Sequence, residues 1–180
     1  MNVSFFLIDI ALFLIPFLYI RFFEKKKLNF KQFIHDFGFS KPNFKTDFLL
    51  SIQIFLWVFA GSLVLSLIFL GLGLNDTAPV ERAVVYFAGF SPLLLIYLFV
   101  VRVFAEELFF RAFMVPRFGV LLSSLVFGAL HFGYGSWAEI AGAIVLGSIL
   151  AYFYEKKRRI VSNYIAHILY NLVVVAVVLL

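Results

Sequence analysis

Two adjacent glutamates and an arginine lie inside an otherwise apolar stretch of this chain. Glu106, Glu107 and Arg111 follow the hydrophobic residues 92–101 and precede the apolar residues 112–116. An ionisable group at membrane depth costs about 2.5–3.5 kcal/mol even on the lenient insertion scale. A chain that places several such groups close together is therefore expected to use them for chemistry.

Three further polar side chains recur downstream at helical spacing. His131 follows Phe127 by four residues, and Asn171 follows His167 by four. A carboxylate and a histidine can take a proton from water, and histidine and asparagine can donate hydrogen bonds to a developing oxyanion. We interpret these groups, together with Glu106, as a candidate active site that hydrolyses an amide bond without a covalent intermediate.

The composition is that of a membrane protein. Hydrophobic residues make up 64% and charged residues 14% of the 180 positions, which excludes an ordinary soluble domain. The chain has no cysteine, so disulfides, thiolate catalysis and Cys-ligated metals are excluded. The net charge of +5 does not indicate nucleic-acid binding, because the basic residues flank hydrophobic segments.

The hydrophobic segments predict an all-α polytopic bundle of about six transmembrane helices in the lipid bilayer. They cover approximately residues 3–23, 48–72, 92–116, 119–132, 137–154 and 160–180. Apolar residues at helical spacing in 30–37 predict a short amphipathic helix at the cytoplasmic membrane surface. We expect a single membrane domain (1–180) with N-terminal helices in 1–91 and a catalytic core in 92–180.

The distribution of basic residues sets the expected orientation. Seven Lys and Arg lie in 21–45 and four in 156–159, whereas the alternate loops carry only Arg82. The positive-inside rule then places the basic loops in the cytoplasm and both termini outside. We expect a multi-pass protein of a prokaryotic cytoplasmic membrane.

This topology brings the polar groups to one depth. At a rise of ~1.5 Å per residue, Glu106, His131 and His167 each lie about 15–20 Å from the nearest cytoplasmic turn. Asn171 lies one helical turn beyond His167, on the same face. A lone intramembrane histidine or Glu–Arg pair is often structural, but a common depth for all of them favours a site.

The two glutamates are expected to differ. Glu107 and Arg111 are in the favourable order for a helical ion pair. Glu106 is then the less committed carboxylate, although Arg102 one turn earlier could also reach it. Three other ionisable residues are not expected to join this layer: Asp9, His35 and Glu139.

Three motifs carry a family resemblance. Glu106-Glu107-x-x-x-Arg111, Phe127-x-x-x-His131 and His167-x-x-x-Asn171 resemble the motifs of the CAAX protease and bacteriocin-processing (CPBP, or Abi) family, which includes type II CAAX prenyl endopeptidases. The resemblance covers about residues 92–180. It implies an intramembrane endopeptidase, reached from the cytoplasm, that acts on a membrane-associated protein or peptide such as a prenylated CAAX protein.

The resemblance also implies a division of roles. Glu106 and His131 would activate water, His167 and Asn171 would form the oxyanion hole, and Glu107 and Arg111 would support the site.

Metal use and two rival functions stay open at this stage. Glu106, His131 and His167 form an acceptable ligand set for a divalent ion such as Zn²⁺, so both metal-dependent and metal-free activation of water are possible. Some family members are associated with bacteriocin immunity, where the protein could be a non-proteolytic membrane scaffold or binding partner. A transporter with a buried cation or proton site is disfavoured by the short fourth segment and the lack of an evident inverted repeat.

Overall fold

The computed structural model describes residues 4–25, 29–39, 43–74 and 76–180, and all regular elements in these ranges are helices. Two of them, η1 and η2, are π-helical, and η3 is a 3₁₀ helix. In chain order the elements are α1 (Ser4–Phe22), α2 (Phe30–Asp36), α3 (Phe44–Gly71), α4 (Ala78–Phe90), α5 (Pro92–Tyr97), η1 (Leu98–Arg102), α6 (Val103–Glu106), η2 (Glu107–Met114), α7 (Val115–Leu130), η3 (His131–Tyr134), α8 (Trp137–Lys157) and α9 (Ile160–Leu179).

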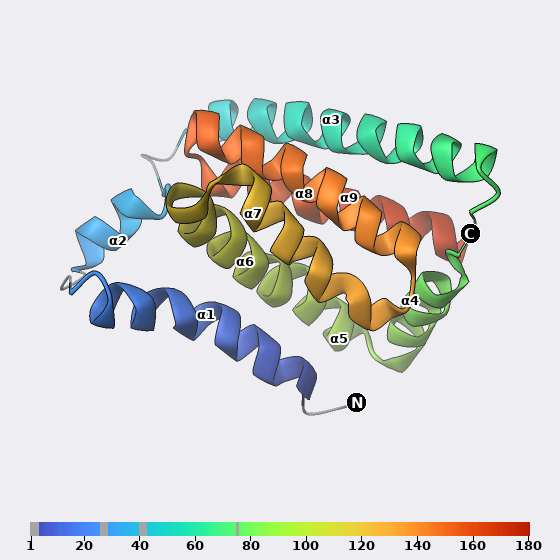
Figure 1. Ribbon diagram of the computed structural model, residues 1–180, viewed down its shortest axis with the longest axis horizontal. Helices are drawn as coiled ribbons and strands as arrows, with labels where there is room; N and C mark the ends of the chain where they lie inside the picture. The colour runs from blue at the N-terminus through green and yellow to red at the C-terminus, as the bar shows by residue number, and fades with distance from the viewer. Residues whose placement is uncertain (1–3, 26–28, 40–42, 75) are drawn as a thin grey trace.

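The long helices run side by side in one bundle (Figure 1). Helix α3 packs on α8 and α9, α7 packs on α8 and η2, and α1 packs on α6 and η2. Helices α2 and α4 lie at opposite ends of this bundle (Figure 1). The start of α1 and the end of α9 both point away from the end at which α2 lies. The all-helical class predicted from the sequence is confirmed for the described residues.

Fewer helices than the expected six are long and apolar enough to cross a membrane. Among the described residues, three helices are long and apolar enough to cross a membrane: Phe44–Gly71, Trp137–Lys157 and Ile160–Leu179. The pair Ala78–Gly89 and Leu93–Tyr134, bent by 117°, adds a fourth if it is one broken span. The count of six is therefore not confirmed.

The fourth predicted segment is the one whose helix is clearly too short to span a bilayer. Within α7, Gly119 has a φ of 81°, a backbone conformation that glycine adopts readily and other residues do not. The regular helix after it, 120–130, is about 16 Å long, against about 30 Å for the hydrocarbon core of a bilayer. Helix α7 is thus too short to cross alone, and η3 continues it.

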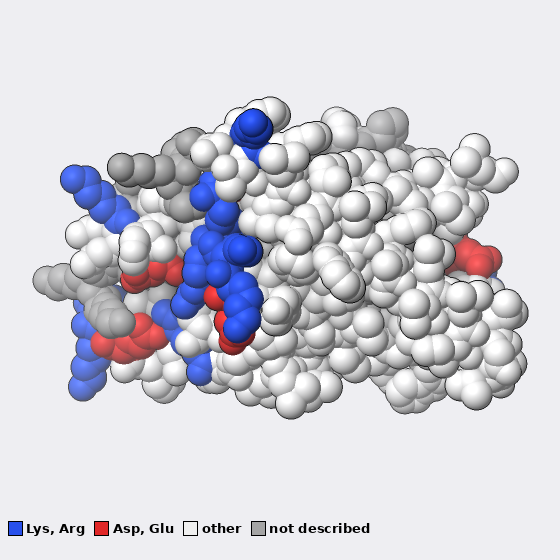
Figure 2. Space-filling view, turned by 90° about the horizontal axis from the view of Figure 1, so that it is seen from above, with Lys and Arg blue, Asp and Glu red and all other residues white. Residues whose placement is uncertain are grey.

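The surface of the bundle is largely apolar. Trp57, Leu67 and Leu121 are 59%, 67% and 71% exposed. Figure 2 shows one face with a broad uncharged middle, Lys and Arg gathered toward one end and a small acidic group at the other. Soluble proteins rarely expose an apolar surface of this extent, whereas lipid covers it at no cost. The chain is an integral membrane protein.

Two ion pairs hold the basic end together. Arg117 Nε lies 2.7 Å from Glu24 Oε1. Arg159 donates to Asp47 through Nε at 2.6 Å and Nη2 at 2.8 Å, and Ser162 Oγ donates to the same carboxylate at 2.9 Å. Arg159, directly before α9, therefore links that helix to α3, and Arg117 links α7 to the turn after α1.

Helix α2 is amphipathic, as predicted, but its apolar face packs on protein. Asn29 and Gln32 form a capping box at its start. Phe33 stacks against Phe17 of α1 at 5.4 Å between ring centroids, and Phe37 is fully buried. His35 is exposed, in agreement with the expectation that it lies outside the polar layer.

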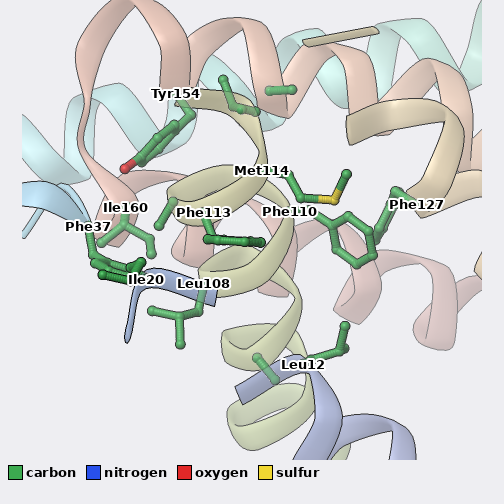
Figure 3. Packing of buried hydrophobic residues seen from close by; sticks show 14 of the residues in the cluster. Leu12, Ile20, Phe37, Leu108, Phe110, Phe113, Met114, Phe127, Tyr154 and Ile160 are labelled. Carbon is green, nitrogen blue, oxygen red and sulfur yellow. The ribbon is translucent and has the colours of Figure 1, made fainter. Parts of the chain in front are cut away.

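The main hydrophobic core surrounds η2 (Figure 3). Phe110, Phe113 and Met114 of η2 belong to one cluster with Leu12 and Ile20 of α1. Other large members are Phe37, directly after α2, and one residue each from α7, α8 and α9, namely Phe127, Tyr154 and Ile160. This core fills the part of the bundle between the glutamates and the basic end.

Candidate active site

The two adjacent glutamates stand at a change of helix type. Glu106 is the last residue of α6, and Glu107 is the first residue of the π-helix η2. π-Helical turns are rare and occur frequently at functional sites. Because neighbouring side chains on a helix point in different directions, Glu106 and Glu107 acquire different partners.

Glu107 joins an arginine to a histidine in the protein interior. Its Oε1 lies 3.5 Å from Arg111 Nη1 and 2.8 Å from His167 Nδ1. Both Glu107 and Arg111 are almost fully buried, at 0% and 1% exposure. The predicted Glu107–Arg111 pair is confirmed. The bond to His167, between helices far apart in sequence, was not predicted.

The bond to Glu107 determines which nitrogen of His167 is available for chemistry. A carboxylate only accepts, so His167 Nδ1 donates. The other nitrogen, Nε2, faces Glu106 and lies 4.0 Å from its Oε2. A carboxylate behind a histidine fixes the ring orientation and the position of its proton in this way in many sites.

Phe127 supports the same group of side chains. Its ring centroid lies 4.4 Å from Arg111 Cζ, a cation–π contact that suits a desolvated guanidinium. The ring also lies 4.6 Å from the His131 ring and 6.1 Å from the His167 ring. Space for it depends on Gly147, because a Cβ there would lie 2.8 Å from Phe127 Cδ1.

His131 is held by its own helix end. It follows the last residue of α7, and its Nδ1 lies 2.8 Å from the Phe127 carbonyl oxygen. Since a carbonyl oxygen can only accept, Nδ1 carries the proton in this bond. His131 Nε2 is therefore the nitrogen available for chemistry.

Four of the six predicted site residues line one cavity of about 230 Å³. These are Glu106, His131, His167 and Asn171. Glu107 does not line this cavity and lies behind His167, as does its partner Arg111. The arrangement separates residues that can touch a substrate from residues that hold them.

Glu106 is bound by Arg102, the partner that the sequence left open. Arg102 Nε lies 3.2 Å from Glu106 Oε1. Arg102 Nη1 also lies 3.3 Å from Asp9 Oδ1, and Tyr97 donates its hydroxyl to Asp9 Oδ2 at 2.6 Å. The expectation that Asp9 stays outside the polar layer is wrong. Helix α1 packs on α6, a neighbour relation that hydrophobic periodicity could not reveal.

Glu139 was also wrongly left out. It lies in the first turn of α8 and lines the cavity beside His131, as does Tyr134. The rings of His131 and Tyr134 stack with centroids 5.9 Å apart. The sequence offered one indication of this contact. The connection between His131 and the start of α8 is short, so the first turn of α8 must lie close to His131.

The predicted metal ligands do not form a metal site here. Among the described residues, no three His, Cys, Asp or Glu side chains converge closely enough to hold a metal ion. Glu106, His131 and His167 share a cavity, but one oxygen of Glu106 is engaged by Arg102.

The cavity extends from Glu106 away from the basic end. In η1 and α6 its lining includes residues up to Glu106, and in α9 it runs from His167 to Val175. Helix α4 covers this side with residues between Val80 and Phe87. The opposite half is filled by the main core. The resemblance implied access from the cytoplasm, whereas the lining extends toward the end that carries few basic residues.

One comparison with known proteins identifies a family. Residues 88–173 match the family model described as "Type II CAAX prenyl endopeptidase Rce1-like". This range contains all six predicted site residues. No curated protein and no solved structure gives a significant match to the chain.

Proposed function

We propose that this chain, which belongs to the family of Rce1-like type II CAAX prenyl endopeptidases, cleaves peptide bonds inside the membrane with Glu106 as the base that activates water. One observation carries the proposal. Glu106 lines the same cavity as His131, His167 and Asn171, and Arg102 donates to its Oε1. Oε2 then serves as the proton acceptor.

The water is activated between Glu106 and His131. A small space of about 30 Å³ beside both residues is large enough for a water molecule. Glu106 takes one proton from this water while His131 Nε2 accepts its second hydrogen as a hydrogen bond. The resulting hydroxide attacks the carbonyl carbon of the substrate's scissile peptide bond.

The tetrahedral oxyanion is stabilised from α9. Asn171 donates from its side-chain amide, and His167 donates from Nε2 when its ring carries a proton on both nitrogens. Glu107 accepts from His167 Nδ1 at 2.8 Å and so fixes the orientation of the ring. Arg111 limits the excess negative charge of Glu107 in the interior. Protonated Glu106 then returns its proton to the leaving amine, and the two product chains separate.

The substrate is a membrane-associated protein or peptide. The cavity walls carry many apolar side chains, including Val58, Phe87 and Leu146, so the segment around the scissile bond is apolar. The family's description names CAAX prenyl substrates, and a prenylated peptide is therefore the first to test.

The topology proposed for this enzyme retains six crossings. The proposed crossings are α1, α3, the run from α5 to η2, α7 with η3, α8 and α9, which run along the bundle (Figure 1). The basic loops lie in the cytoplasm and the two termini outside.

The test compares wild-type protein with Glu106→Gln in lipid vesicles. The probes are a fluorogenic farnesylated CAAX peptide, its unmodified form and an apolar membrane-anchored peptide. Loss of a general base lowers turnover by ~10²–10⁴-fold. Glu155→Gln, which changes a half-exposed glutamate at the basic end, is the matched control and should cleave like the wild type.

Three outcomes separate the alternatives. A fully active Glu106→Gln protein would remove Glu106 from the mechanism. Wild-type protein that binds peptides of this set but cleaves none would support a non-proteolytic binding protein. Activity that is lost on exhaustive chelation and restored by Zn²⁺ would assign the reaction to a metal at Glu106, His131 and His167.

A further inference from the structure

A buried aspartate of the first helix belongs to a chain of hydrogen bonds and ion pairs that ends at Glu106. Asp9 lies in α1, outside the residues 88–173 that match the family, and is 2% exposed. It accepts from Tyr97 Oη at 2.6 Å and lies 3.3 Å from Arg102 Nη1. Arg102 Nε lies 3.2 Å from Glu106 Oε1. Arg102 is thus clamped between two carboxylates.

We propose that Asp9 is a positioning residue of the active site, which acts on Glu106 through Arg102. This inference rests on the proposed function. Asp9 lines neither the main cavity nor the small space beside Glu106, so it does not touch a bound substrate. Any effect on the reaction must pass through its neighbours.

The planar guanidinium explains how Asp9 can act. Its Nε and Nη1 lie in one rigid plane. Nε donates a hydrogen bond to Glu106, whereas Nη1 forms an ion pair with Asp9 at 3.3 Å without hydrogen-bond geometry. With Nη1 held by Asp9, Arg102 engages Glu106 through a single oxygen. Without Asp9, the guanidinium can turn and take both oxygens of Glu106 in a bidentate pair, the geometry that arginine and carboxylate favour. Glu106 would then lose the oxygen that accepts the proton.

Helix α1 is built to hold Asp9 in this place. Phe6 packs edge-on against Tyr97 with centroids 5.2 Å apart, and Phe13 packs against Phe104 at 6.1 Å. Leu12, close to Asp9 in sequence, is part of the main core. A buried carboxylate is costly in a membrane, and a mere lipid anchor would not need one.

Asp9→Asn is the first variant to measure. Asparagine keeps the size and still accepts from Tyr97, but it removes the charge that holds Arg102. We expect kcat for the peptide probe to fall about 10–100-fold, as small displacements of catalytic groups do. KM should change little because the cavity wall is intact. Tyr97→Phe, which removes only the support of Asp9, should lower kcat less.

A matched Asp–Arg pair supplies the control. Asp47 is bound by Arg159 at the basic end, remote from the cavity lining. Asp47→Asn should lower the melting temperature and leave kcat unchanged. If Asp9→Asn behaves in the same way, Asp9 is merely structural and the inference is overturned.

A double-mutant cycle tests the route through Arg102. If Asp9 acts only through Arg102, Asp9→Asn should cause no further loss of kcat in an Arg102→Gln protein. In detergent, the melting-temperature losses of the same two changes should be clearly non-additive, whereas those of Asp47→Asn and Arg102→Gln should add. Additive losses for Asp9 and Arg102 would overturn the proposal.

The thermal cycle needs no substrate, so it separates this inference from the proposed function. Activity that survives Glu106→Gln would refute the base, yet coupling between Asp9 and Arg102 would still be measured. Strong thermal coupling with unchanged kcat in Asp9→Asn would refute the positioning role alone.

Discussion

At the scale of residues, the adjacent glutamates have opposite surroundings. Glu107 is fully buried between Arg111 and His167, whereas Glu106 borders the cavity and shares Arg102 with Asp9. Removal of one partner from a buried ion pair leaves an uncompensated charge. Removal of the Glu106 charge leaves Arg102 beside Asp9. Substitutions at the two positions should therefore differ more in their effect on the stability of the protein than in their effect on its activity.

This difference predicts distinct phenotypes for two isosteric changes. Glu107→Gln should destabilise the protein by about 3–5 kcal/mol, the typical effect of breaking a buried pair, and should also lower activity because His167 loses its acceptor. Glu106→Gln should melt near the wild type and lose turnover. Thermal unfolding in detergent measures the first quantity, and peptide cleavage measures the second. Equal melting temperatures for the two variants would contradict the assignment of partners.

The site could be predicted where it depends on spacing within one helix. Glu107 and Arg111 are four residues apart, so their pairing followed from sequence. Contacts between helices could not be obtained in this way. To predict the hydrogen bond from His167 to Glu107 and the ion pair between Arg102 and Asp9, one must know which helices neighbour α9 and α1. Depth along the bundle predicted a shared layer but not which side chains meet in it.

At the scale of elements, one loop side chain fastens the start of α8. Asp76, between α3 and α4, accepts from the backbone N–H groups of Trp137 and Ala138 and from Ser136 Oγ. Desolvation raises the pKa of the Asp76 carboxyl, but these donors outweigh it and hold the pKa below its ordinary value. The ionised carboxylate also suits the positive end of the helix dipole. Residues near Glu139 are thereby placed at the cavity.

The shifted pKa predicts a pH dependence of stability. Because the folded-state pKa is depressed, Asp76 contributes its full stabilisation above the unfolded value of about 3.9 and loses it as pH falls through the folded value. Asp76→Asn should thus lower the melting temperature by a constant amount above about pH 5. The difference from wild type should shrink below about pH 4. Melting temperatures of both proteins in detergent between pH 3 and pH 8 measure this difference. A difference that does not change with pH would contradict the role assigned to the ionised Asp76 carboxylate at the start of α8.

Helix type was less predictable than helix position. The predicted ranges from 92 to 180 match the observed helices to within a few residues, but the π-helical turns η1 and η2 were not expected. Apolar periodicity cannot distinguish them in a stretch where nearly every residue is apolar. Glu107 and Arg111 lie in the π-helix η2, whose turns are wider than those of an α-helix. The buried partners of these two residues, and not local helix propensity, account for the wider turn.

At the scale of the molecule, charge is polarised along the bundle. Lys and Arg gather toward one end in Figure 2, while the cavity extends from Glu106 toward the other. The sequence predicted the membrane class and the basic loops, because each of these depends on the combined character of many residues and not on a single contact. It could not settle the number of crossings, since α7 is short and α4 meets the following helix at a bend of 117°.

The last prediction decides the number of crossings and the side of entry together. The chain has no cysteine, so single cysteines can be introduced without background. Leu74→Cys lies after α3, and Lys156→Cys lies at the end of α8. If the run from α5 to η2 and the segment α7–η3 each cross, three crossings separate these positions and an impermeant thiol reagent labels them from opposite faces. If Ala78–Gly89 and Leu93–Tyr134 form one broken span, only two crossings separate them and both label from one face.

The same reagent reports on the cavity. Val174 lines it on the side away from the basic end, so Val174→Cys should be labelled from the face that labels Leu74→Cys. A half-buried position such as Ile144, which packs near Gly128 at the α7–α8 contact, is the control and should react slowly from both faces. Labelling of Val174→Cys only from the face that labels Lys156→Cys would contradict the predicted side of entry. That result would instead favour an opening through the basic end, as the family resemblance implied.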